Sequence, residues 1–427
     1  MKRKVLESSR RNFVKGVSTL IVTSKFGLNQ FRINKLFSPM THDGLKVIDK
    51  EVVFVGDQVD GFYRPVSSEF IFSQFPEIPE VPESIPVHFP WKVETSATFP
   101  ERSLNGFGAL NEGIYSEGPN ILQIIATTPG KPDTKGGSPS YKNWYRVSND
   151  SGKTFSDFRL IVLEGNSENN PIDGVEIGRN GYTIPFTSVI FRSHQGELMV
   201  PIHLHPWDEK KKEIYNPANA YLFGDSGVLI GKWAPDFKDV AWKFGNWLRI
   251  DHQLSTRGLF EPSVAELKTD GRFAMVMRGS NHTQADLPGY TWLSFSNDQC
   301  RTWSDPVPFT YSNGKNFYTP ASCSTLFRSE KTGTLYWIGN VLPENSNGNN
   351  PRNPLVIGRV DEHNFGLIKE SIVGIDFRHK ESESENVELS NYKIMEHADL
   401  DEILIALTRR EKGKWAQAPS WYRIELS

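Results

Sequence analysis

The chain has little that would let disulfides or a metal hold it together. Only two cysteines, Cys300 and Cys323, occur among its 427 residues, which excludes a disulfide-dense scaffold and a zinc site built on cysteines. The two could form one bridge or stay as free thiols. His203 and His205 stand two residues apart, but no third metal ligand accompanies them. We therefore expect neither a metal nor a cofactor.

The chain also lacks a strong net charge and a long apolar run. Its formal net charge is −3, so no global field attracts nucleic acid or an anionic membrane. An anionic ligand would have to be held by local arginines. No stretch of roughly 20 apolar residues is present, which excludes a membrane-spanning helix. We therefore expect neither a nucleic-acid partner nor a membrane span in the mature protein.

Aromatic residues, glycine and proline are abundant: 27 Phe, 13 Tyr, 11 Trp, 34 Gly and 27 Pro. Aromatic and β-branched side chains fit a pleated, half-buried surface, and Gly and Pro supply its turns. Short apolar runs between turn residues predict buried strands at residues 52–55, 121–125, 188–191, 198–200, 273–277, 335–338 and 403–407. The sequence therefore predicts an all-β fold.

Three stretches repeat one unit, in which a strand is followed by a glycine-containing turn and a second strand. They are residues 189–201, 264–277 and 325–338. Such a unit cannot bury its own faces and has to pack against neighbours, which favours a ring of sheets without exposed edges. A β-sandwich uses the same short strands and is the alternative.

Two octapeptides bear on that choice. Residues 148–155 (Ser-Asn-Asp-Ser-Gly-Lys-Thr-Phe) fit Ser-x-Asp-x-Gly-x-Thr-Trp/Phe throughout, and residues 296–303 depart from it only at Cys300. The pattern resembles the Asp box of sialidase-like propellers. That resemblance implies a six-bladed β-propeller of four-stranded antiparallel blades, in which the motif is structural. Glycine supplies a positive φ in such a turn, so Cys300 would be strained there.

The N-terminus carries a different motif. Residues 9–15 read Ser-Arg-Arg-Asn-Phe-Val-Lys and precede the mildly apolar residues 16–24. The run resembles the twin-arginine export signal, and an ordinary basic leader is the alternative. The resemblance implies that residues 1–45 are signal and linker, that residues 46–427 form the propeller, and that the protein is periplasmic or extracellular.

The sialidase resemblance also implies a set of catalytic groups. In that family three arginines bind the sugar carboxylate, a glutamate activates a tyrosine nucleophile, and an aspartate is the acid/base. Residues 261–267, followed by a glycine turn and Arg278, are similar to the segment that carries the glutamate and the second arginine. On this match Glu261 is the activating base and Arg278 binds the carboxylate. A plain ion pair between the two is the structural alternative.

The nucleophile is expected further along the chain. Residues 389–395 are similar to the family's tyrosine segment and lie two blades after Glu261, so Tyr392 would be the nucleophile; a plain strand tyrosine is the alternative. Residues 323–326 resemble the same segment with Cys323 in place of the tyrosine. We reject that register because it falls only one blade after Glu261.

The remaining substrate contacts match less closely. Arg352, between Pro351 and Pro354, offers the third arginine, and Tyr318 is a possible substrate contact. Sialidases begin with Tyr/Phe-Arg-Ile-Pro, and residues 62–65 (Phe-Tyr-Arg-Pro) offer Arg64 without the isoleucine. Asp133 is the candidate acid/base if the ring opens at residues 115–119 instead.

These residues support three functions. The first is an exported glycoside hydrolase that acts on a terminal acidic sugar such as sialic acid, with a glycan as its substrate. The second is a polysaccharide lyase that abstracts a proton beside a uronate carboxylate, for which His203, His205 and His282 are available. The third is a non-catalytic glycan-binding propeller, with Trp207, Trp242 and Trp247 as stacking surfaces.

Overall fold

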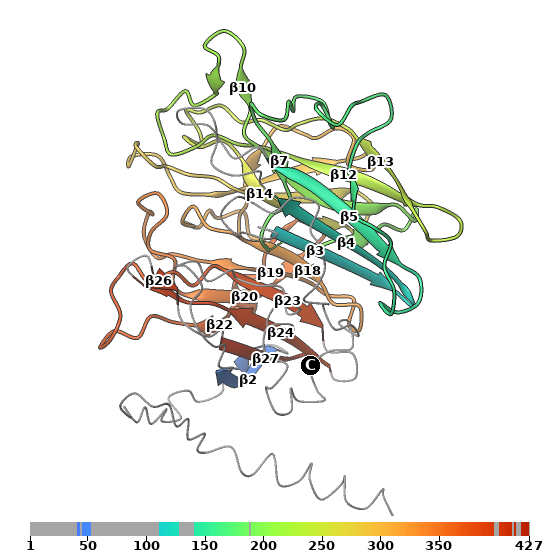
Figure 1. Ribbon diagram of the computed structural model, residues 1–427. Coiled ribbons are helices and arrows are strands. Elements are labelled where there is room, and N and C mark those ends of the chain that lie inside the picture. Colours follow the sequence, from blue (N-terminus) through green and yellow to red (C-terminus); the bar gives the residue numbers. More distant parts are fainter. Residues whose placement is uncertain are drawn as a thin grey trace, which may run out of the picture. The chain divides into compact units, whose positions relative to one another are not determined.

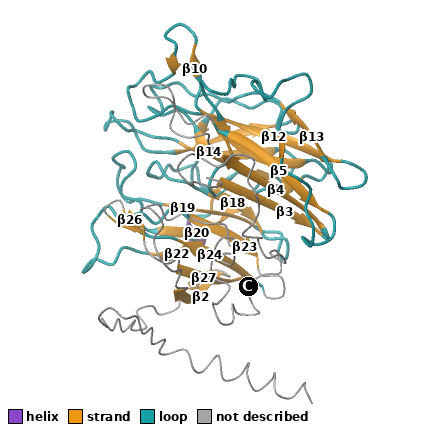
Figure 2. Cartoon of the chain, viewed as in Figure 1, coloured by secondary structure: helices purple, strands orange, loops and turns teal. Residues whose placement is uncertain are grey.

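The computed structural model describes residues 41–42, 45–52, 111–127, 141–187, 189–396, 401–411, 414–415 and 420–426. These residues are all-β, as predicted, apart from the single 3-10 helix η1 (Lys369–Ser371) (Figure 1, Figure 2). Among them is no helix long and apolar enough to cross a bilayer. The chain divides into two compact units, Met1–Ser38 and Pro39–Ser427. The first unit, with the proposed export signal, lies outside the described residues.

Five antiparallel sheets follow one another along the chain, and we call them blades 1 to 5 (Figure 1). Blade 1 has the order β3 (Asn111–Glu117), β4 (Asn120–Thr127), β5 (Lys142–Ser148), β6 (Arg159–Leu160). Blade 2 has the order β13 (Val240–Phe244), β12 (Asp225–Trp233), β9 (Leu198–Leu204), β7 (Tyr182–Thr183), and β8 (Phe191–Arg192) also pairs with β9. Blade 3 has the order β14 (Phe260–Glu266), β15 (Phe273–Arg278), β16 (Thr291–Ser296), β17 (Val307–Pro308).

Blades 4 and 5 complete the series. Blade 4 has the order β18 (Thr325–Arg328), β19 (Leu335–Asn340), β20 (Leu355–Asp361), β21 (Gly366–Leu367), and β22 (Val373–Asp376) also pairs with β20. Blade 5 has the order β1 (Thr41–His42), β2 (Leu45–Val52), β27 (Ser420–Leu426), β24 (Glu402–Leu407), β23 (Tyr392–Glu396). Two small ribbons project from the blades: β10 (Trp207–Asp208) with β11 (Glu213–Ile214), and β25 (Arg410–Glu411) with β26 (Lys414–Trp415).

Separate apolar cores lie between consecutive blades. Successive side chains of a strand point to opposite faces of its sheet, and β9 shows the consequence. Val200 packs in the core with blade 1, whereas its neighbour Met199 packs in the core with blade 3. All seven residues of β9 are therefore buried. Successive sheets with a core on each face form a propeller and exclude the two-sheet sandwich.

The described residues leave the predicted sixth blade unconfirmed. We expected six four-stranded blades, but the described residues contain five, and blades 2, 4 and 5 have a fifth strand. The extra strands are the short edge pieces β8, β22 and β1, which add a few ladder bonds to each sheet. Residues 53–110 lie outside the described residues.

The first described strands belong to the last blade. β2 pairs along its whole length with β27, the C-terminal strand. Blade 5 is thus built from both ends of the described chain, which ties the first strands to the last. β1 falls inside residues 1–45, the stretch expected to be signal and linker.

The three repeated units form hairpins, as predicted. They correspond to β8–β9, β14–β15 and β18–β19. Their turns place Gly196, Gly271 and Gly333 at φ of 84°, 71° and 72°. Only glycine adopts such a left-handed conformation without cost, which explains the shared glycine.

The two octapeptides fold into matching turns after the third strand of blades 1 and 3. In the second turn the Asp298 carboxylate accepts from the Thr302 amide at 2.9 Å, and Ser296 Oγ accepts from the Cys300 amide at 3.0 Å. Cys300 has a φ of 62°, so it carries the left-handed strain that glycine would avoid. Cys300 and Cys323 are both buried free thiols.

Candidate functional site

Glu261 occupies a distorted point of strand β14. The register of β14 against β15 shifts between Phe260 and Ser263, and Glu261 has a φ of 51°. A left-handed backbone costs a non-glycine residue about 1–2 kcal/mol. Such strain persists where the surrounding structure enforces it, and it is concentrated at functional sites. The strained backbone at this bulge therefore indicates that the orientation of the Glu261 side chain is important for function.

Glu261 is paired with Arg278 at the end of β15. Arg278 Nη1 donates to Glu261 Oε2 at 2.6 Å, and the two side chains are 8% and 19% exposed. Burial by itself raises the pKa of Glu261, but the charge and hydrogen bond of Arg278 outweigh it and lower that pKa to about 2. Glu261 is therefore a carboxylate at neutral pH.

Two further arginines join Arg278. Arg257 Nη1 and Arg278 Nη2 each donate to Asn349 Oδ1 at 3.1 Å, and Arg352 Nε donates to the Asn349 carbonyl at 3.0 Å. The arginines come from the turn before β14, from the end of β15 and from the segment between β19 and β20. All three are buried. We call Arg257, Arg278 and Arg352 the arginine cluster.

Within the described residues, the arginine cluster carries more positive charge than its carboxylate partners neutralise. Burial and the neighbouring charge of Arg278 lower the pKa of Arg257 to about 9, and the same two causes lower the pKa of Arg352. Glu388 accepts from Arg352 Nη1 at 2.9 Å but also from Arg410 Nη1 at 2.7 Å. Among the described residues, Arg278 pairs with Glu261, Arg352 shares Glu388 with Arg410, and Arg257 has no carboxylate partner. The arginines of the cluster therefore outnumber their carboxylates, which favours an anion at this site.

Two buried histidines lie beside Glu261. His203 and His205 lie two residues apart along β9 and its end, with ring centroids 5.9 Å apart. His205 Nδ1 bonds the Phe223 carbonyl oxygen at 2.7 Å, whereas His203 Nδ1 has no hydrogen-bond partner within the described part of the chain. Burial lowers the pKa of His203 to about 3 and that of His205 to about 4, so both are neutral at pH 7.

Aromatic side chains border the arginine cluster. The Arg257 guanidinium lies 4.6 Å from the Phe260 ring centroid and 5.6 Å from that of Tyr221. Tyr221 is 76% exposed, so its other face is open to a ligand. Burial, followed by the influence of Tyr221 and Glu261, raises the pKa of Tyr141 to about 12. Tyr141 therefore lies near enough to sense the Glu261 charge.

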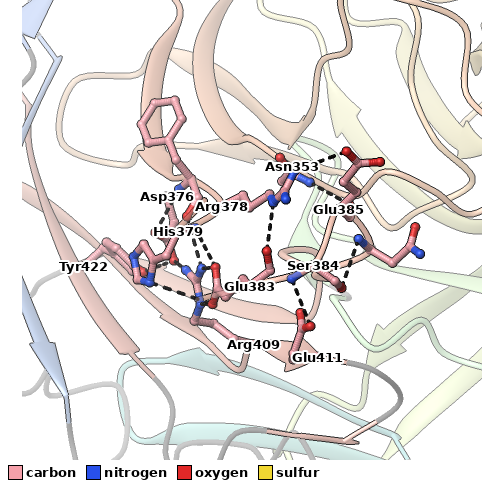
Figure 3. Close-up of polar contacts among 12 residues, drawn as sticks. Asn353, Asp376, Arg378, His379, Glu383, Ser384, Glu385, Arg409, Glu411 and Tyr422 are labelled. Carbon is pink, nitrogen blue, oxygen red and sulfur yellow. Dashed lines mark hydrogen bonds and ion pairs between the residues drawn. The ribbon is translucent and has the colours of Figure 1, made fainter. Parts of the chain in front are cut away.

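A second polar network in blades 4 and 5 positions the segment that carries Glu388. Arg409 donates to both Asp376 and Glu383, and Tyr422 donates to Asp376 (Figure 3). Asp376 is fully buried and these carboxylates already have close partners. This network is accordingly structural: it holds residues 377–391 against the strands of blade 5.

The structure brings together some of the predicted site residues. Glu261, Arg278 and Arg352 meet around Asn349. Arg64 and Asp133 lie outside the described residues. Tyr318 stacks on Tyr290, with ring centroids 6.1 Å apart.

Tyr392 lies in the core rather than beside Glu261. It is fully buried, and its hydroxyl donates to the Ile338 carbonyl at 2.9 Å and lies 3.1 Å from Thr325 Oγ1. The residue that contacts Glu261 from blade 4 is Cys323, whose Sγ lies 3.1 Å from Glu261 Oε2. The register with Cys323 in the tyrosine position, which we rejected from the sequence, is the one that reaches Glu261.

The sequence reasoning missed Arg257 and Asn349. Arg257 lies four residues before Glu261, followed by a glycine, which is a signal for a sharp turn that presents a side chain next to the strand start. Asn349 lies in an asparagine-rich run just before Arg352 and carries no pattern that separates it from its neighbours. Within the part of the chain that the structure describes, no three His, Cys, Asp or Glu side chains are grouped to hold a metal.

No protein-family model matches the chain, and no curated protein matches it in sequence. Among solved structures it is similar to a protein of unknown function from Dyadobacter fermentans, at 12% identity and TM-score 0.48 over 75% of this chain and 77% of that one. It is also similar to Trypanosoma rangeli sialidase, at 12% identity and TM-score 0.45 over 75% of this chain and 46% of that one. A third match is the intramolecular trans-sialidase from Ruminococcus gnavus, at 16% identity and TM-score 0.42 over 74% of this chain and 57% of that one. The matched region thus spans about half of those two enzymes.

At such low identities and TM-scores, this likeness carries no conclusion about the fold or the reaction of this chain. The fold assignment rests on the sheets of this chain. With five successive antiparallel blades, an apolar core between each blade and the next, and two matching serine–aspartate turns, the described part of the chain has a β-propeller fold.

Proposed function

We propose that this protein is an exported glycoside hydrolase that acts on a terminal acidic sugar and binds the sugar's carboxylate with the arginine cluster. The observation that supports this most strongly is the convergence of Arg257, Arg278 and Arg352 on Asn349 from three separate segments. Buried guanidinium groups repel one another unless an anion joins them. Arginine forms bidentate hydrogen bonds with a carboxylate, so a sugar acid fits both the charge and the geometry.

Glu261 supplies the second element of the proposed reaction. Glycoside cleavage passes through a transition state with positive charge at the anomeric carbon. An ionised Glu261, held by its strained backbone and by Arg278, can stabilise that charge or accept a proton from an attacking phenol.

For that phenol we propose Tyr141 in place of Tyr392. Tyr141 is the tyrosine whose pKa is raised in part by the Glu261 charge, whereas the Tyr392 hydroxyl is bonded inside the core. Burial keeps the Tyr141 phenol protonated at rest, so a nearby base has to take its proton as it attacks. Tyr141→Phe should therefore abolish turnover and leave sugar binding intact.

The test is hydrolysis of fluorogenic glycosides of acidic sugars, including a sialoside and a glucuronide, by the wild-type chain. Arg278→Lys keeps the charge but loses the bidentate fork, and we expect kcat/KM to fall by about 100-fold. Arg272→Lys, in the outer hairpin turn where Arg272 pairs with Asp270, is the matched control and should be neutral. If the wild type binds acidic sugars but releases no fluorophore from any glycoside, the protein is a glycan-binding propeller and the hydrolase proposal fails.

A uronate lyase is the second candidate, and His203 favours it. A neutral imidazole whose Nδ1 is unbonded among the described residues, close to Arg278 and Glu261, could abstract a proton beside a carboxylate that the arginines neutralise. Lyase cleavage gives an unsaturated uronate that absorbs in the ultraviolet. Formation of that chromophore from a polyuronate, lost in His203→Gln, would establish the lyase and exclude the hydrolase.

We also propose that the chain is exported by the twin-arginine route, on the basis of residues 9–15. Replacing Arg10 and Arg11 with lysine should retain the protein in the cytoplasm. Cell fractionation checks this, and unchanged export of the double variant would contradict it.

A further inference from the structure

Asn349 is the shared acceptor of the arginine cluster. Its amide oxygen accepts from both Arg257 and Arg278, and its backbone carbonyl accepts from Arg352. One neutral residue therefore contacts all three guanidinium groups.

The loop around Asn349 is held firmly. Asn281, which is 1% exposed, accepts from the Gly348 amide at 2.8 Å and donates to the Ser346 carbonyl at 2.7 Å. The backbones of Asn347 and Asn350 bond each other. Asn349 thus projects from a fixed turn, and the hydrogen bonds from Arg257 and Arg278 orient its amide oxygen.

The chemistry of an amide matters at this point. An amide oxygen accepts two guanidinium N–H groups and so holds them side by side, but it carries no net charge. An aspartate in the same place would be a built-in counter-ion for the arginines. The natural residue spaces the guanidinium groups and leaves their charge available to a ligand.

We propose that Asn349 is a positioning residue that spaces Arg257 and Arg278 for a ligand carboxylate, and that its lack of charge gives the site its preference for acidic over neutral sugars. This inference rests on the proposed function. In this proposal Asn349 selects the charge of the sugar and takes no part in bond cleavage.

The test compares Asn349→Asp, Asn349→Ala and Asn347→Asp in the full chain. Binding of N-acetylneuraminate and D-glucuronate, and of the methyl ester of each, is measured by calorimetry. We expect Asn349→Asp to weaken binding of at least one acid by about 10- to 100-fold and to leave ester binding unchanged. Asn347→Asp adds the same charge to the exposed neighbour on the turn and should change acid binding by less than about threefold.

The stability of the same variants without ligand is measured alongside the binding. A carboxylate among unneutralised arginines should stabilise the fold, so Asn349→Asp should denature at higher denaturant concentration than Asn349→Ala. If the wild type binds the acids and Asn349→Asp binds them equally well, Asn349 does not select charge, while the proposed function stands. If the wild type binds none of the four sugars, the proposed function and this inference fall together. If Asn349→Asp is less stable than Asn349→Ala, the cluster has no charge to spare and the inference is wrong.

Discussion

The Cys323 thiol donates a hydrogen bond to Glu261 Oε2 across 3.1 Å, to the same oxygen that accepts from Arg278 Nη1. A sulfur atom thus reaches the glutamate where the family resemblance placed a phenol. Burial, and after it the Glu261 charge, raise the pKa of this thiol well above its ordinary value. A protonated thiol is a weak nucleophile, so the geometry makes Cys323 a hydrogen-bond donor.

The first prediction follows from that role. Cys323→Ser keeps a donor of similar size and should retain kcat within about fivefold, and Cys323 in the folded protein should resist iodoacetamide. Kinetics of the variant and mass spectrometry of the treated wild type check both statements. Complete loss of turnover in Cys323→Ser, together with rapid alkylation, would identify Cys323 as a nucleophile.

The second prediction concerns the buried ion pair. Arg278→Ala leaves the Glu261 charge buried and unpaired, which should lower the free energy of unfolding by about 3–5 kcal/mol. Adding Glu261→Gln removes that charge, so the double variant should recover part of the loss. Chemical denaturation measures both. An Arg278→Ala variant as stable as Arg272→Ala, at the exposed turn, would show that the pair is dispensable for stability.

The third prediction concerns pH. His203 and His205 have pKa values lowered to about 3 and about 4, so the native state keeps them neutral while the unfolded chain takes up protons below about 6.5. Their contribution to stability is complete above pH 6.5 and falls between pH 6.5 and 4, by about 1.4 kcal/mol per pH unit for each histidine. In His203→Gln the change in the free energy of unfolding per pH unit should be smaller by about 1.4 kcal/mol, the contribution of one proton. The exposed His363→Gln is the control, and an equal slope in both variants would contradict the assignment.

The fourth prediction separates two roles for Tyr392. Its hydroxyl donates to the Ile338 carbonyl inside the core between blades 4 and 5. Tyr392→Phe should lower the free energy of unfolding by about 1–2 kcal/mol and leave kcat unchanged. Total loss of turnover in a variant of normal stability would restore Tyr392 as the nucleophile.

The fifth prediction concerns Tyr221. Its exposed ring lies beside Arg257, and we expect its apolar face to stack on the sugar that follows the acidic one. Tyr221→Ala should raise KM for an acidic disaccharide by about 5- to 20-fold without changing the binding of a single acidic sugar or the stability. An equal loss for mono- and disaccharide would place Tyr221 at the carboxylate itself.

Sequence reasoning was most successful where the signal is local. The glycine turns at 196, 271 and 333 and the serine–aspartate turns are set by the residues within each turn. The pairing of Glu261 with Arg278 is also local, since one hairpin joins them and Phe260 faces Arg278 in the register. The make-up of blade 5 is different, because it depends on the pairing of β2 with β27, which lie at opposite ends of the described chain.

The sequence by itself determined the all-β class and the hairpin units, including the hairpin that joins Glu261 to Arg278, because each depends on residues within about 20 positions of one another. Only the tertiary structure decided which blade-4 residue reaches Glu261, and that Arg257, Arg278 and Arg352 meet on Asn349. Those contacts join segments up to 92 residues apart. They arise from the packing of one blade against the next, which the spacing of residues along the chain does not encode.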